Sequence, residues 1–308
     1  MRQGQAICTI AIGIGVTPDD LPARHLLAYD RTVIQRKYDD TSRVPELCEQ
    51  AKPDDTSFLT DFPEGASGDF SSWQEAARLC SFDQPEFLER VFSAAKAVAS
   101  GSAVHMRDGS LFDEIEYSWP LLAGLLYAAA KSGGRLVVLD FGGSLGTTYF
   151  QNRRFLDRLE AVEWHIVERE VYCEFATRYL QHPRLHFHRS IEACCATGAE
   201  PGVIVFSSVL QSLPDPWALL ATIGDLPVRH VLIDRCSISA EKRDRLTVFR
   251  ASAAAAANMT RPMWFFDEVR LLAALGPDFR LIERFSGFEK LPGIPSQFHG
   301  YILERAAG

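Results

Sequence analysis

The sequence has no long apolar run, no excess of basic residues and no regular cysteine pattern. None of its apolar runs approaches the roughly 18 residues needed to span a bilayer, so we expect no membrane span. With 32 Lys and Arg against 40 Asp and Glu, the formal net charge is −8. That balance disfavours nucleic acid as the main partner, because phosphate binding needs clustered cations.

The seven cysteines are scattered, with one adjacent pair, Cys194 and Cys195. An odd, unpatterned set is typical of reduced thiols in a cytoplasmic protein rather than of a disulfide framework. Two histidines, His186 and His188, precede this pair on one face of an expected strand. Their spacing fits no standard zinc-ligand pattern, so the sequence predicts no metal.

There is no internal repeat and no low-complexity tract, and 308 residues suit one large domain or two small ones. The composition, 47% hydrophobic, is that of a globular protein with a real core. The apolar stretch at 6–16 imitates a signal peptide, but it is short and lacks a clear cleavage site. We interpret it as a strand. Residues 1–68 form an N-terminal extension to which the sequence assigns no function.

The most informative stretch runs over 135–151 and reads RLVVLDFGGSLGTTYFQ. The unbroken apolar run at 136–139 predicts a strand buried on both faces of a parallel sheet. Gly142, Gly143 and Gly146 follow, and glycines let the backbone turn sharply and approach a ligand closely. A helix-compatible segment comes next, at 149–159. Strand, loop and helix together predict the first unit of a nucleotide-binding α/β sheet.

Asp140 separates two classes of cofactor. A dinucleotide fingerprint reads GxGxxG and holds a pyrophosphate at the helix N-terminus. A carboxylate immediately before the glycines would repel a pyrophosphate but would attract a cationic ligand of the methionine type. The alternative is an ordinary strand, turn and helix whose glycines serve tight packing.

A second carboxylate, Glu168, ends the next expected strand, at 164–168, roughly 20 residues after the glycines. In this fold an acid at that place accepts the two hydroxyls of a ribose. Dehydrogenases share the feature, so Glu168 supports a nucleoside without identifying it.

The remaining pattern predicts helices and strands in alternation. Helices are expected after a Ser72 capping box through Leu79, and at 86–99, 121–131, 249–257 and 268–275. Strands are expected at 184–188, 202–206 and 230–235, and as an antiparallel pair at 279–285 and 299–304. In open α/β sheets ligands bind beyond the carboxyl ends of strands, so Ser207, Asp234 and Arg235 are site candidates. A structural ion pair is the alternative for the last two.

Several segments together resemble a bacterial family of S-adenosylmethionine-dependent methyltransferases of the class I, Rossmann-like type, often linked to surface-polysaccharide gene sets. The resemblance covers about 70–304. It is carried by DEIEYSWPLL at 113–122, LDFGGSLG at 139–146, YFQNR at 149–153, SSVLQ at 207–211, LPDP at 213–216 and IDR at 233–235.

The resemblance implies a seven-stranded, mostly parallel sheet with an antiparallel C-terminal strand and a helical N-terminal cap. It divides the chain into an extension at 1–68, a cap at 69–132 and a cofactor-binding domain at 133–308. It implies transfer of a methyl group to an oxygen or nitrogen of a small molecule or sugar. A homodimer stays an open option.

The resemblance also implies roles for single residues. Around the cofactor it places Asp140, Gly142, Gly143, Ser144, Gly146, Glu168, Ser207 and Gln211. Toward the substrate it places Tyr117, Trp119, Tyr149, Gln151, Asn152 and Arg235. If an oxygen is methylated, His299 and Asp234 are the candidates for a general base.

Three other functions stay open at this point. The fold could serve chemistry other than methyl transfer, since Gln211 and Ser212 stand where many relatives have a histidine. The chain could be a non-catalytic binding module with 1–68 as its docking part. A nicotinamide dehydrogenase is disfavoured by Asp140.

Overall fold

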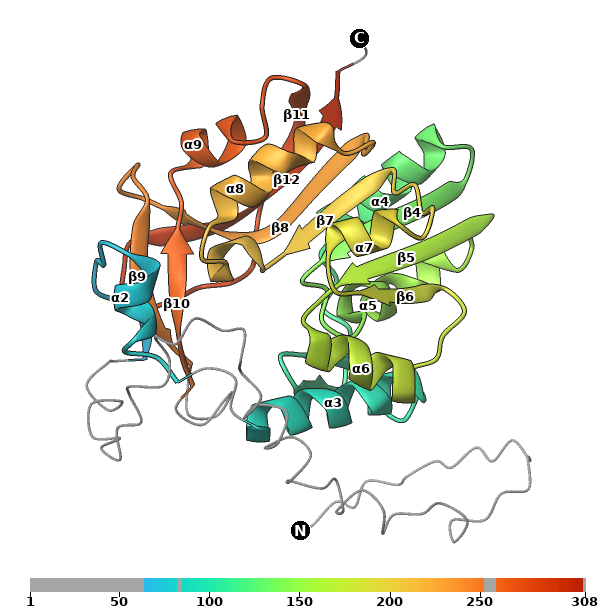
Figure 1. Ribbon diagram of the computed structural model, residues 1–308, viewed down its shortest axis with the longest axis horizontal. Coiled ribbons are helices and arrows are strands. Elements are labelled where there is room, and N and C mark those ends of the chain that lie inside the picture. The colour runs from blue at the N-terminus through green and yellow to red at the C-terminus, as the bar shows by residue number, and fades with distance from the viewer. Residues whose placement is uncertain (1–63, 82–84, 252–258, 307–308) are drawn as a thin grey trace, which may run out of the picture. The chain divides into compact units, whose positions relative to one another are not determined.

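Short, uniformly apolar strands form the centre of the fold. The computed structural model describes residues 64–81, 85–251 and 259–306. Seven strands lie in the order β11-β12-β8-β7-β4-β5-β6 (Figure 1). Their bounds are β4 Arg135–Phe141, β5 Ala161–Val167, β6 Leu185–His188, β7 Val203–Ser207, β8 His230–Ser239, β11 Phe279–Ser286 and β12 Ser296–Arg305.

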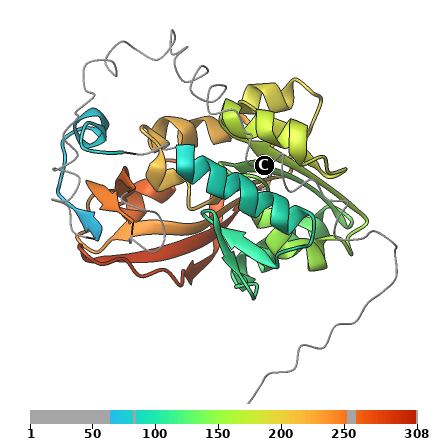
Figure 2. The same cartoon turned by 90° about the horizontal axis from the view of Figure 1, so that it is seen from below.

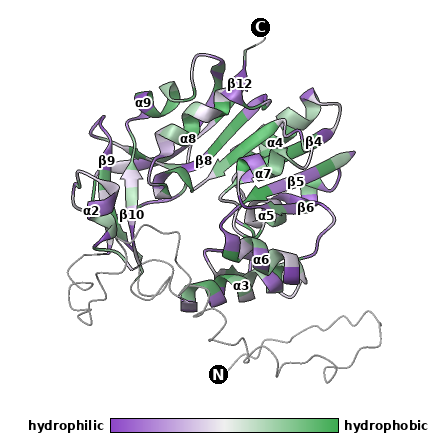
Figure 3. Ribbon diagram, viewed as in Figure 1, coloured by the Kyte–Doolittle hydropathy of each residue, from purple (hydrophilic) through white to green (hydrophobic). Residues whose placement is uncertain are grey.

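The strands from β4 to β8 pair in parallel, and β12 pairs antiparallel with both β8 and β11. The expected mostly parallel sheet of seven strands with an antiparallel C-terminal strand is thereby confirmed. β7 is coloured as a hydrophobic strand in Figure 3, and its residues 203–206 are buried, as expected of a strand that is covered on both faces.

Helices cover both faces of this sheet. One core joins side chains such as Val138 and Leu232 to α3 Pro85–Ala99, α4 Trp119–Lys131, α5 Thr147–Leu156 and α6 Glu170–Tyr179. The other joins Leu139 and Ile233 to α7 Ile191–Cys195, α8 Pro216–Thr222 and α9 Glu268–Ala273. Neighbouring residues of one strand thus enter opposite cores, as the alternation of side chains in a strand requires.

Side-chain caps begin several of the helices. Ser72 Oγ accepts a hydrogen bond from the Glu75 amide at 3.2 Å, as the capping pattern predicts, although α2 Trp73–Ala77 ends before Leu79. Asp267 likewise accepts from the amides of Val269 and Arg270 at the start of α9. Two short 3₁₀ segments, η5 Leu210–Ser212 and η6 Ile223–Asp225, flank α8.

A second, smaller sheet was not predicted from the sequence. It is antiparallel, with β9 Arg245–Arg250 between β1 Gly65–Ser67 and β10 Thr260–Phe265. The expected helix over 249–257 is wrong at its first two positions, which belong to β9, and the rest falls largely outside the described residues. α2 packs on β9 and β10, as the blue helix beside the orange strands shows (Figure 2).

The N-terminal segments contact different parts of the structure. β1 pairs with β9, α2 packs on the small sheet, and α4 packs on β4, β8 and β12. A hairpin of β2 His105–Arg107 and β3 Ser110–Phe112 lies between α3 and α4 in the chain. The expected strand at 6–16 lies outside the described residues. Among the helices that are described, none is both long and apolar enough to cross a membrane.

Candidate functional site

The loop between β4 and α5 has a conformation that depends on its glycines. Gly142 and Gly146 have φ values of +69° and +85°, which side-chain-bearing residues adopt only at a cost. A Cβ added to Gly142 would lie 2.3 Å from a methyl carbon of Val209, in the segment after β7. The loop is therefore packed against the carboxyl end of β7 and leaves no room for side chains there.

Asp140 lies beneath this loop and is fully buried. Trp164 Nε1 donates a hydrogen bond of 2.9 Å to Oδ2, whereas Oδ1 is buried without a hydrogen-bond partner. A Cβ added to Gly143 would lie 2.4 Å from the carboxyl carbon of Asp140, so the two residues require one another. Burial raises the pKa of Asp140 to about 7, and the charge of Glu168 adds to this rise.

Glu168 joins the same loop to the end of β5. Its Oε1 accepts from the Ser144 amide at 3.1 Å and its Oε2 accepts from the Arg169 amide at 2.9 Å. Ser144 is held at a φ of +53°. The two predicted carboxylates therefore lie at the tips of neighbouring strands and border one backbone loop.

A bulge in β8 positions the second half of the site. Tyr301 pairs with Ile233 and His299 pairs with Cys236, so Asp234 and Arg235 together lie opposite Gly300. Arg235 has a φ of +54°. A bulge of this kind bends the strand and redirects its side chains, and bulges are frequent beside active sites. Here it lets two successive charged residues take part in one network.

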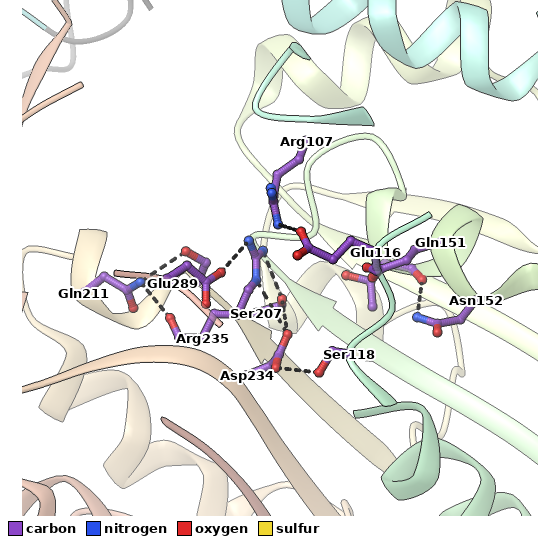
Figure 4. A network of polar contacts seen from close by, with 12 residues as sticks. Arg107, Glu116, Ser118, Gln151, Asn152, Ser207, Gln211, Asp234, Arg235 and Glu289 are labelled. Atoms are coloured by element: carbon purple, nitrogen blue, oxygen red, sulfur yellow. Dashed lines mark hydrogen bonds and ion pairs between the residues drawn. The ribbon is translucent and has the colours of Figure 1, made fainter. Parts of the chain in front are cut away.

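Asp234 is the centre of that network (Figure 4). Ser118 Oγ donates to its Oδ1 at 2.9 Å, and Ser207 Oγ donates to its Oδ2 at 3.2 Å. The Arg235 guanidinium reaches Asp234 Oδ2 at 3.5 Å, Ser207 Oγ at 3.2 Å and Glu289 Oε1 at 3.3 Å. Burial raises the pKa of Asp234 and the pKa of Glu289, although Arg235 opposes both rises.

Gln211 supports the network from η5. Its side chain is buried, and Nε2 donates to Ser208 Oγ at 3.1 Å and to the Arg235 carbonyl at 3.0 Å. Its Oε1 is buried without a hydrogen-bond partner. Ser208, like Ser144 and Arg235, has a positive φ. Such backbone strain costs of order 1 kcal/mol or more per residue and clusters at functional sites, which favours this edge of the sheet as one.

The side chain of His299 contacts residues outside the Asp234 network. Its Nε2 lies 2.9 Å from Arg284 Nη2 and 3.1 Å from Gln297 Oε1. Burial and the neighbouring Arg284 lower its pKa. These contacts belong to a pocket of about 380 Å³ that Glu268 also lines, and none of them joins the Asp234 network. His299 pairs with Cys236, two residues after Asp234 in β8, but its side chain contacts Arg284 and Gln297, so its role as a base stays a prediction.

The predicted substrate residues on α5 divide into two groups. Tyr149 is buried in the core, and its hydroxyl donates to Asp157 at 2.9 Å. Asn152 is also buried and donates to the Thr148 carbonyl, with its Oδ1 unpartnered. Gln151, in contrast, donates to the Glu116 carbonyl and so joins α5 to the segment that carries Ser118.

The two aromatic residues predicted to face the substrate, Tyr117 and Trp119, lie together against Phe155 of α5. Tyr117 and Trp119 stack with ring centroids 4.6 Å apart, and both meet Phe155 edge to face. Trp119 is 57% exposed. Exposed Trp119 and half-buried Tyr117 flank Ser118 in the chain and form an apolar surface there.

Three polar residues at the site were not found from the sequence. Ser118 and Glu289 contact the network from segments far from the predicted strands, so only the tertiary structure reveals them. His105 is buried in β2, where burial and the charges of Arg107 and Arg235 lower its pKa. Ser118 lies in the quoted segment 113–122, but nothing local marks it as a partner of Asp234, and His105 and Glu289 lie in short or irregular segments.

Comparison with known proteins gives distant structural likenesses alone. No family model matches the sequence, and no curated protein matches it significantly. The N-terminal domain of EvdMO1, solved with S-adenosylhomocysteine and D-fucose, is 15% identical, with a TM-score of 0.44 over 71% of this chain and 97% of that one.

Two further structures are similar at the same level. The 1,6-didemethyltoxoflavin-N1-methyltransferase of Burkholderia thailandensis is 19% identical, with a TM-score of 0.38 over 74% of this chain and 92% of that one. The magnesium protoporphyrin IX methyltransferase of Synechocystis PCC 6803 is 12% identical, with a TM-score of 0.41 over 61% and 79%. These values concern the fold alone, and the ligands of these proteins do not transfer to this chain.

The buried carboxyl of Asp140 predicts a specific pH dependence of stability. In the folded chain it keeps its proton up to about pH 7, whereas the unfolded chain releases it near 3.8. The wild-type protein should therefore lose stability relative to Asp140→Asn as pH rises between those values. Over that pH range, the difference in free energy of unfolding between the two proteins should change by at most about 4 kcal/mol, since each pKa unit corresponds to about 1.4 kcal/mol.

Urea unfolding of both proteins at pH 5 and pH 8 measures the part of this change that lies between pH 5 and the pKa of about 7, which is about 3 kcal/mol. Asp113→Asn, at an exposed position, is the matched control and should follow the wild type at both pH values. A difference between wild type and Asp140→Asn that does not change with pH would contradict the buried, protonated carboxyl.

Proposed function

We propose that this chain is an S-adenosylmethionine-dependent methyltransferase that acts on an oxygen or nitrogen of a small molecule or sugar. The observation that carries the proposal is the pair of carboxylates, Asp140 and Glu168, at one glycine loop. Three of the five loop residues at 142–146 are glycines, and backbone without side chains suits close approach of a nucleoside ligand. The methyltransferase motifs fall on this same edge of the sheet.

The donor set suits a cationic nucleoside better than a pyrophosphate. Asp140 has one buried oxygen without a partner, and its pKa of about 7 means that a nearby positive charge would favour the ionised form. The carboxylate of Glu168 can accept the hydroxyls of a ribose. S-adenosylmethionine, when bound, supplies a methyl group made electrophilic by its positively charged sulfur.

The residues beyond this loop would bind and orient the acceptor. Asp234 is buried, has a raised pKa and accepts from the hydroxyls of Ser118 and Ser207. A carboxylate with a raised pKa can take the proton of an acceptor hydroxyl near neutral pH. Arg235 and Glu289 fix one another and leave Asp234 in a defined orientation. Holding the acceptor in line is the main contribution that such a site makes.

Substitution Glu168→Gln tests the cofactor assignment. Loss of a charged acceptor to the ribose removes roughly 1.5–3 kcal/mol of binding, so the Kd for S-adenosylhomocysteine should rise about 10-fold to 100-fold. Isothermal titration calorimetry measures the change. Glu170→Gln is the matched control, because Glu170 follows Glu168 by two residues, begins α6 and pairs with exposed Arg189. Equal affinity in both variants would contradict the assignment. So would a wild type that binds NAD more tightly than S-adenosylhomocysteine.

Substitution Asp234→Asn tests the proposed base. Loss of general-base catalysis typically costs about 10²-fold to 10⁴-fold in rate. We expect kcat for methyl transfer from S-adenosylmethionine to an acceptor hydroxyl to fall by a factor in that range. The affinity for the cofactor should be unchanged.

An acceptor panel of sugars and small molecules, followed by chromatography of S-adenosylhomocysteine, provides the assay. Asp225→Asn, an exposed position after α8, should behave as wild type. Loss of activity in His299→Gln with full activity in Asp234→Asn would reverse the assignment of the base. No S-adenosylhomocysteine with any acceptor would favour chemistry other than methyl transfer.

A further inference from the structure

We propose that His165, His188 and Cys194 form a binding site for a divalent transition-metal ion of the zinc class. One potential ligand atom from each residue lies within 4.8 Å of the other two. The group is separate from the Asp234 network and takes no part in the function proposed above. Two imidazoles and a thiol form a donor set that suits zinc.

The distance between the two imidazoles is close to that in a metal site. His165 Nδ1 and His188 Nε2 are 3.0 Å apart and form a hydrogen bond with each other. Two nitrogens at 2.0–2.1 Å from a tetrahedral zinc are about 3.3 Å apart. A metal ion can therefore take the place of the hydrogen atom between the two nitrogens if the rings move slightly apart.

Secondary structure holds the three residues in place. β5 and β6 are parallel neighbours whose register pairs Val167 with His188, which brings the His188 ring next to the His165 ring. Ser190 then caps α7 by accepting from the Ala193 amide at 3.1 Å. α7 packs against both β5 and β6 (Figure 1) and carries Cys194, which is fully buried on that side.

The carboxylate of Glu163 lies near the second ring nitrogen of His165. The second nitrogen of His165, Nε2, is buried without a hydrogen-bond partner, and its nearest acidic oxygen is Glu163 Oε2 at 3.7 Å. A metal-bound histidine usually donates its other ring N–H to a carboxylate, which fixes the tautomer and orients the ring. Glu163 is thus at the place where such a partner is needed, on the side of His165 away from His188.

The spacing of these three residues along the sequence does not reveal that they lie close together. His186 and His188 share a strand face, but His186 is exposed and stacks on His165 rather than completing the group. The third ligand comes from the neighbouring strand, 23 residues before His188. Spacing along the sequence therefore predicts no metal, whereas the pairing of β5 with β6 brings the donors together.

A bound ion would stabilise the edge of the sheet beside Glu168. The backbone carbonyl of His188 accepts from the Glu168 amide at 2.9 Å, so the strand end that carries His188 also positions Glu168. Three protein ligands leave a fourth position for water, and half-buried His188 gives access from solvent.

Zinc content of the full chain tests the proposal. The protein is stripped with a chelator, dialysed against Zn²⁺ alone and measured by atomic emission. We expect about one equivalent in the wild type and less than a tenth of that in His188→Ala and Cys194→Ser. His186→Ala and Cys195→Ser are the matched controls, since each removes an exposed neighbour of the same type and should retain the zinc.

X-ray absorption at the zinc edge of the unmodified chain removes any dependence on how the variants fold. We expect a first shell of two nitrogen ligands of imidazole type and one sulfur. A wild type that retains no zinc, a shell without sulfur, or loss of zinc in the controls but not in the two ligand variants would overturn the proposal.

Discussion

The contact between Asp140 and Gly143 is the constraint on which the candidate site depends. A fully buried carboxyl lies against the backbone of the glycine loop, and any larger residue at Gly143 would occupy the space of the carboxyl. Burying this group is unfavourable, because it loses water, and the hydrogen bond of 2.9 Å from the Trp164 indole offsets only part of that loss. In the proposed function, a cationic ligand beside the loop would offset part of this cost.

The other half of the site depends on the bulge in β8. Without it Asp234 and Arg235 would face opposite sides of the sheet, and only one could reach Ser207. Gly300 makes the bulge feasible, because a Cβ there would lie 2.1 Å from the Phe285 ring. The two halves meet at the carboxyl ends of β4, β5, β7 and β8. That is where an open parallel sheet offers unpaired backbone groups and room for a ligand.

Local signals predicted the centre of the fold well and its periphery poorly. Unbroken apolar runs such as 203–206 have no stable place except a strand covered on both faces, so the parallel sheet follows from them. The small sheet does not, because β9 pairs with residues 65–67 and 260–265, and such distant pairing leaves no local pattern. For the same reason the contacts of Ser118 and Glu289 with the Asp234 network were missed.

The central claim is that Asp140 and Glu168 together bind a sulfonium nucleoside. A crystal structure of the chain with S-adenosylmethionine tests it most directly. The account predicts that the ribose hydroxyls lie within hydrogen-bond distance of the Glu168 carboxylate and that the amino-acid part lies against the loop at 142–146. A ligand bound elsewhere, or a loop edge closed by side chains with both carboxylates directed away from it, would contradict the account.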